Sequence, residues 1–186
     1  MLTLEKAQKL LEKTTTQEHL FLHAKNVMAA MEGLAKHFGE DSEHWKAIGY
    51  LHDYDYEMYP QEHLQHTEAP LKEEGVTDEE IRAILSHGYM IINDVEPVTN
   101  MEKSLFAVDE LTGIIQAAAR MRPMGITDME INSFMKKFKD KKFAAKCDRE
   151  LIKKACEMLG MEVKDVAYIC IEAMKNYADE LQLGVK

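Results

Sequence analysis

The chain has 186 residues, 46% of them apolar, and a net charge of −10 at neutral pH; this length suits one domain with a substantial core, and the acidic balance argues against a nucleic-acid binder, whose phosphate contacts require a basic surface. No apolar run approaches the roughly 20 residues that cross a bilayer, and the N-terminus lacks a signal-peptide pattern, so no membrane partner is expected. Three cysteines without a C-x-x-C pair are typical of reduced thiols, which predicts a cytoplasmic protein.

The first half of the chain is predicted to be helical, because apolar residues recur at spacings of three and four and no stretch alternates with a period of two. We expect a short helix over about 2–13, followed by a longer helix that Thr16 caps and Gly39 ends. Asp41 is expected to cap a third helix, whose apolar stripe continues to His52.

The second half of the chain carries the same helical pattern. Thr77-x-x-Glu80 and Thr127-x-x-Glu130 have the form of capping boxes, which predicts a helix start at each, and Pro123 marks a joint between helices. The other helices are expected over about 60–74, 101–119, 148–159 and 162–183. The predicted fold class is therefore all-α, in one domain without an internal repeat.

Three of the predicted helices carry an ionisable side chain on or beside an apolar face. These side chains are His23, His52 and Asp109, and Asp53 directly follows His52. A buried aspartate without a partner is costly, and imidazole together with carboxylate suits divalent transition metals. A single inward histidine is more often a satisfied core residue, but the whole set favours a metal site between facing helices.

The same four residues form a known motif. His23, His52-Asp53 and Asp109, with intervals of 29 and 56 residues, resemble the H…HD…D signature of the HD-domain metal-dependent phosphohydrolases. The resemblance covers about residues 16–120. It implies an all-α HD-domain helical bundle in which this part of the chain is the metal-binding core.

Three further segments, 49–57, 105–112 and 136–145, are similar to the small, single-domain bacterial members of that family. The last of them resembles the C-terminal extension of those proteins. We therefore expect one HD-type domain over residues 1–186, with a helical extension over residues 121–186.

The resemblance also implies a ligand set. For one divalent ion (Mn, Fe, Co, Ni or Zn) the implied ligands are His23, His52, Asp53 and Asp109. Some members of the family hold a second ion through two extra histidines, and His66 and His87 lie in the matching interval, with His63 as an alternative donor. In such a site Asp53 would bridge the two ions.

A bound metal lowers the pKa of water toward about 7, which suits hydrolysis of phosphate esters. The expected function is a metal-dependent phosphohydrolase, either a phosphomonoesterase or a phosphodiesterase, that acts on a small metabolite such as a nucleotide as a monomer or homodimer. Asp53, Asp55 and Glu57 are the candidate catalytic residues, although the last two can equally belong to a solvated acidic loop. The alternatives are a non-catalytic regulatory module that binds metal or nucleotide, and a plain helical scaffold.

A phosphorylated substrate also needs cationic partners. The segment 136–149 contains seven basic residues against two aspartates, and Arg120 and Arg122 follow the helix of Asp109. A basic segment on an acidic protein can steer an anionic ligand, so Arg122, Lys136 and Lys137 are candidates for substrate binding. The alternative for the segment is a solvated helix face that pairs with nearby carboxylates.

Overall fold

The computed structural model describes residues 1–185, and within them the chain is helical without a β-strand. This confirms the predicted all-α class. The helices are α1 Leu4–Leu11, α2 Glu18–Phe38, α3 Ser42–Leu51, α4 Glu68–Glu73, α5 Asp78–Ser86, α6 Asn100–Arg120, α7 Ile131–Lys139, α8 Arg149–Leu159 and α9 Val163–Lys175. None of them is both long enough and apolar enough to cross a bilayer.

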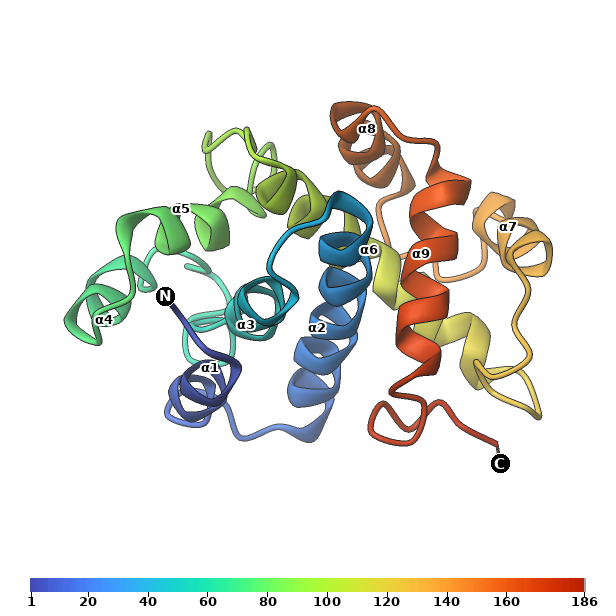
Figure 1. Cartoon of the computed structure of the whole chain (residues 1–186), viewed down its shortest axis with the longest axis horizontal. Coiled ribbons are helices and arrows are strands. Elements are labelled where there is room, and N and C mark those ends of the chain that lie inside the picture. Colours follow the sequence, from blue (N-terminus) through green and yellow to red (C-terminus); the bar gives the residue numbers. More distant parts are fainter. Residues whose placement is uncertain (186) are drawn as a thin grey trace.

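Helix α2 lies at the centre of the bundle and packs against α3, α6 and α9 (Figure 1). Helix α1 covers α3 on one side, and α8 packs against α6 on the other. The close approach of α9 to α2 depends on Gly33, since a Cβ atom there would lie 2.7 Å from the Cβ of Ala173. The C-terminal helices therefore support the two long helices, α2 and α6, that carry His23 and Asp109.

Helix caps follow the local sequence at several of these ends. Asp41 caps α3 by accepting hydrogen bonds from two backbone N–H groups, and Gly39 ends α2 with a φ of +70°. The capping box of Thr77 and Glu80 opens α5 as predicted. A second capping box, which the sequence analysis did not identify, joins Thr99 to Glu102 at the start of α6.

Other boundaries differ from the prediction. Thr127 forms no capping box, because its hydroxyl donates to the carbonyl of Met124 and α7 begins only at Ile131. The last helix ends at Lys175 rather than near residue 183. The chain turns there, which buries Leu183 and lets its carbonyl accept the N–H of Ile126.

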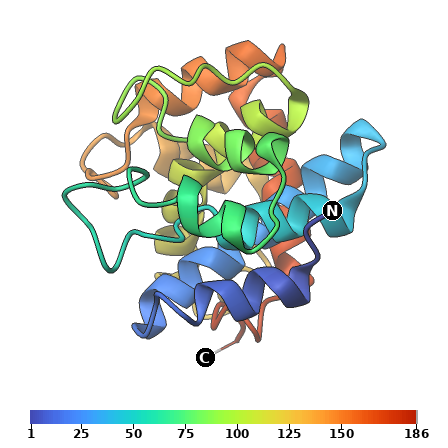
Figure 2. The ribbon, with the colours of Figure 1, turned by 90° about the vertical axis from the view of Figure 1, so that its left-hand side faces the viewer.

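The largest difference lies between α3 and α4, where a helix was expected over about 60–74. Only Glu68–Glu73 is helical, and residues 52–67 form a series of turns that loops outward at the left of Figure 2. Leu64 has a φ of +69°, which a helix does not tolerate. The backbone N–H groups of Leu64 and His66 both donate to the carboxylate of Asp55, so this side chain shapes the turn.

The capping box of Thr99 and Glu102 at the start of α6 can be tested by changing Glu102. Burial disfavours its charged form, but hydrogen bonds from Arg82 and from the N–H groups of Val98 and Thr99 outweigh burial and lower its pKa. We predict that Glu102→Gln lowers the free energy of unfolding by about 1–3 kcal/mol at pH 7.

The pH dependence follows from the direction of that shift. Because the folded-state pKa of Glu102 lies below the unfolded-state value, its contribution is complete above the unfolded-state pKa and is lost as the pH falls through the folded-state pKa. Urea unfolding at pH 7 and at lower pH measures this difference, with Glu96→Gln at an exposed position as the control. A loss of the same size at every pH would contradict the assignment.

Candidate metal centre

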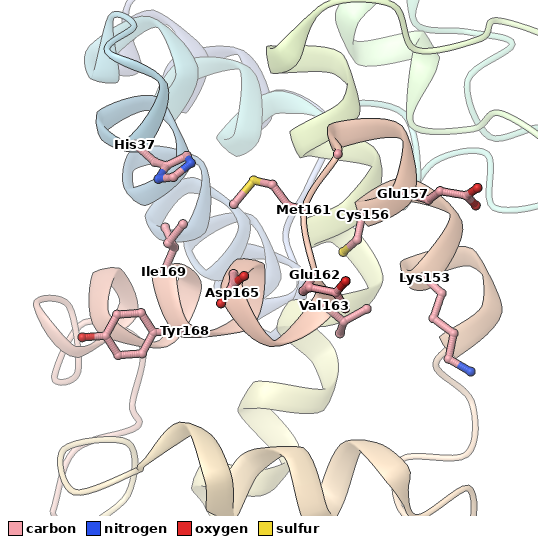
Figure 3. A pocket seen from close by; sticks show the side chains of 11 residues that line it. His37, Lys153, Cys156, Glu157, Met161, Glu162, Val163, Asp165, Tyr168 and Ile169 are labelled. Carbon is pink, nitrogen blue, oxygen red and sulfur yellow. The ribbon is translucent and has the colours of Figure 1, made fainter.

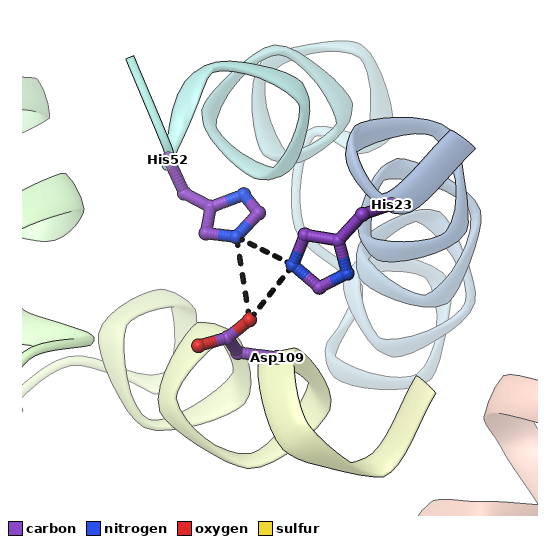
Figure 4. Close-up of side chains that lie close together, drawn as sticks. All are labelled: His23, His52 and Asp109. Carbon is purple, nitrogen blue, oxygen red and sulfur yellow. Dashed lines mark hydrogen bonds and ion pairs between the residues drawn. The ribbon is translucent and has the colours of Figure 1, made fainter. Parts of the chain in front are cut away.

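The motif residues come together between α2, α3 and α6. The Nε2 atom of His23 lies 3.1 Å from Nε2 of His52 and 3.0 Å from Oδ1 of Asp109, and the last two atoms are 3.3 Å apart (Figure 4). Oδ2 of Asp53 lies 3.6 Å from His23 Nε2 and 3.4 Å from His52 Nε2. These four atoms form the first donor group.

The spacing in this group suits a divalent ion. Metal bonds of about 2.0–2.2 Å with tetrahedral or octahedral angles put neighbouring ligand atoms about 2.9–3.6 Å apart, which matches the distances of 3.0 to 3.6 Å measured here. His52 is fully buried, and its Nδ1 lies 2.8 Å from the carbonyl of Gly49. A carbonyl only accepts, so Nδ1 carries the proton and the lone pair of Nε2 in the neutral ring points into the group.

A second donor group lies on the other side of Asp53. Oδ1 of Asp53 is 3.2 Å from Nε2 of His63 and 3.6 Å from Nε2 of His87, and these two nitrogens are 3.2 Å apart. The Nδ1 atom of His87 donates to the carbonyl of Ile84 over 2.6 Å, so its Nε2 also presents a lone pair in the neutral ring. Three acceptor atoms that face one another need a cation between them, either protons or a metal ion.

Two of the four histidines end helices. His52 is the C-cap of α3 and His87 the C-cap of α5, and each ring donates to the carbonyl three residues before it. The C-terminus of a helix carries partial negative charge from its free carbonyl groups. Both helix ends therefore add to the attraction that the carboxylates exert on a cation.

The side chain of Asp55 orients the second donor group. It is 1% exposed, lies 2.8 Å from Nδ1 of His63, and also accepts the N–H groups of Leu64 and His66. Burial raises the pKa of Asp55, but these hydrogen bonds outweigh burial and lower it, so the carboxyl stays ionised. Such a carboxylate fixes the tautomer of a metal-binding histidine. With its oxygens engaged in this way, Asp55 is not available as a catalytic acid or base.

The structure does not bring His66 to the site, although the sequence analysis placed it at the second ion. Its ring stacks on Tyr59 with centroids 3.9 Å apart, and its Nε2 bonds to Glu62 over 2.7 Å. His63, the alternative donor, lies beside His87 instead. The reason is the turn around Asp55, which points these two histidines in different directions where a regular helix had been expected.

Glu57 also lies apart from the donor groups. Its carboxylate accepts the backbone N–H groups of Thr16 and Gln17 over 2.8 and 3.1 Å and the hydroxyl of Thr16 over 2.6 Å. Glu57 therefore binds the two residues that precede α2. The N-cap of α2 is Gln17, and not Thr16 as predicted, and its side chain makes no capping hydrogen bond. These hydrogen bonds give Glu57 a structural partner in place of a catalytic one.

The predicted cationic residues lie elsewhere on the protein. Arg122 pairs with Asp128 over 2.8 Å and lines a separate small cavity with Lys137. The amino group of Lys137 lies over the ring of Phe143, and Lys136 is exposed on α7. None of these three residues lines the cavity over the donor groups.

The histidines and the carboxylates of the site stabilise each other's charged forms. Burial disfavours the protonated form of His23, but Asp109 and Asp53 outweigh it and raise its pKa to about 9. His63 behaves in the same way, since Asp53 and Asp55 raise its pKa to about 9. The pKa values of Asp53 and Asp109 are correspondingly lowered. Without a metal, protons thus take the place of a cation, and a metal ion would displace them.

A cavity of about 580 Å³ opens over both donor groups. Besides ligand side chains it is lined by His19, Leu20, Tyr56, Ile91, Ile92, Glu110, Gly113, Gln116, Arg120 and Cys147. The lining includes Arg120, which the sequence analysis named as a candidate cation, and Gln116, which it did not single out, although helical spacing from Asp109 places both on the same face of α6.

A larger groove of about 880 Å³ lies along α8, α9 and the end of α2 (Figure 3). It contains none of the motif residues. Its lining is mixed, with Tyr168, Met161 and Cys156 beside Lys153 and Asp165. The groove is therefore separate from the donor groups.

Comparisons with models of protein families, with curated proteins and with solved structures found no match for this chain.

The pair His63 and His66 gives a matched test of the second donor group. We predict that His63→Ala lowers the number of Mn²⁺ or Zn²⁺ ions bound per chain from two to one, whereas His66→Ala leaves it at two. The reason is that only the His63 ring faces Asp53 and His87. Elemental analysis after equilibrium dialysis measures the stoichiometry, and equal metal content in the two variants would rule out His63 as a ligand.

Proposed function

We propose that this protein is a metal-dependent phosphohydrolase that uses one or two divalent transition-metal ions to hydrolyse a small phosphate ester. The observation that carries the proposal is the position of Asp53. One of its oxygens faces His23 and His52, and the other faces His63 and His87. A carboxylate shared by two donor groups is the arrangement expected where two ions act on one phosphate group.

When bound, the ions would lower the pKa of water and offset the negative charge of the phosphate oxygens. The chain itself supplies the positions of the reacting groups. Asp53 would hold the two ions at a set separation, and Asp55 keeps the ring of His63 in its orientation. His52 and His87 are held by their own helix carbonyls, so the donor atoms need no rearrangement before an ion binds.

The wall formed by α6 supports binding of an anionic substrate. Arg120 and Gln116 line the cavity and offer a cation and an amide to phosphate oxygens. Glu110 lines the same wall, where burial and the neighbouring charge of Asp109 raise its pKa and the N–H of Asp148 donates to it. Arg120 and Gln116 thus replace Arg122, Lys136 and Lys137 as the proposed phosphate-binding side chains.

Hydrolysis is tested with a panel of phosphomonoesters and phosphodiesters in the presence of Mn²⁺, Fe²⁺, Co²⁺, Ni²⁺ or Zn²⁺. We predict turnover of at least one ester, and we predict that Asp53→Asn lowers kcat/KM by about 100-fold or more, because one change weakens both donor groups. Asp165→Asn, at an exposed position on α9, is the control for the loss of one carboxylate.

The competing function is a regulatory module that binds metal or nucleotide without turnover. Metal binding and a ligand-dependent rise in Tm, with no ester hydrolysed under any metal, would favour that module over the hydrolase. Turnover that survives Asp53→Asn unchanged would exclude the site described here as the catalytic centre.

A further inference from the structure

The loop between α5 and α6 exposes three consecutive large apolar side chains. Met90, Ile91 and Ile92 are 62%, 59% and 42% exposed. Six of the twelve large apolar side chains that are exposed among residues 1–185 lie here or on the segment 54–59. Exposed apolar patches beside a cavity are uncommon without a binding role.

The exposure is held in place by the backbone. The carbonyl of Gly88 accepts the N–H groups of Ile91, Ile92 and Asn93, and the side chain of Asn93 donates to the carbonyl of Leu85. Met90 has a φ of +65°, an uncommon conformation for a side chain of its size. The loop conformation that exposes these apolar side chains therefore includes a strained backbone at Met90.

Two of these side chains belong to the rim of exposed and buried residues around the candidate metal centre. Ile91 and Ile92 line the cavity over the donor groups, together with Tyr56. The ring of Tyr56 contacts the ring of His63 edge-on, with centroids 5.2 Å apart, and His87 immediately precedes the loop at Gly88. We call Tyr56, Ile91 and Ile92 the apolar wall. It lies beside the second donor group.

We propose that the apolar wall holds a flat apolar or aromatic group of the substrate, so that the preferred ligand is an aromatic phosphate ester. The inference rests on the proposed function, since it assigns a phosphate to the donor groups. The cavity has the size of a small-molecule site, and its lining also contains the polar side chains of Gln116 and Arg120. This combination of apolar and polar lining residues fits one ligand with an apolar body and an anionic end.

The experiment compares two phosphonates that differ only in this group, phenylphosphonate and methylphosphonate, by calorimetry on the full chain loaded with Mn²⁺. We expect the wild type to bind phenylphosphonate about tenfold more tightly, from burial of the ring against apolar side chains. In Ile91→Ser/Ile92→Ser this preference should be lost, while the affinity for methylphosphonate stays unchanged. Ile91→Ser alone should reduce the preference in part.

Val98→Ser is the matched control, because Val98 is 59% exposed, as Ile91 is, but lines none of the cavities described. Equal affinity of the wild type for the two phosphonates, no binding of either, or an equal effect of Val98→Ser would overturn the inference. Neither affinity requires turnover. If the protein prefers phenylphosphonate but hydrolyses no ester, only the proposed hydrolase function is refuted. If it hydrolyses an ester but shows no preference for phenylphosphonate, only the proposed role of the apolar wall is refuted.

Discussion

The carboxylate of Asp53 is the group on which the arrangement of the site depends. Four imidazole rings surround it, and their Nε2 atoms lie 3.2 to 3.6 Å from its two oxygens. At least three of those nitrogens carry lone pairs in the neutral ring, since the Nδ1 atom of each donates to a carbonyl or a carboxylate. Such a concentration of acceptors is stable only with cations among them. Protons on the histidines supply part of the positive charge that these acceptors require, and a pair of divalent ions would supply all of it.

The rest of the fold positions those rings. Helix α2 carries His23 and is braced by α9 through the close contact at Gly33. The ends of α3 and α5 supply His52 and His87 at positions where the helix carbonyls are free to accept from the rings. Helix α6 brings Asp109 to the same place. A site built from helix ends and faces is more precise than one built on loops, and among the donor residues described here Asp53 and His63 lie in the turns that follow α3.

The sequence predicts the parts of this site that depend on helical periodicity. His52 and Asp109 lie on apolar stripes and His23 lies at the edge of one, so their approach follows from packing the stripes together. The position of His63 does not follow in this way, because it depends on a turn that the side chain of Asp55 shapes through three hydrogen bonds. Spacing alone leaves His63 and His66 equivalent. The sequence also does not predict that Ile91 and Ile92 are exposed, because isoleucine side chains are usually buried.

The central claim is that Asp53 joins two metal ions, and anomalous diffraction from crystals grown with Mn²⁺ tests it most directly. We predict two anomalous peaks about 3.5–4 Å apart, one among His23, His52 and Asp109 and the other beside His63 and His87, with the Asp53 carboxylate between them. A single peak in the first group would contradict the two-ion site, and the absence of any peak at these residues would contradict the metal centre as a whole.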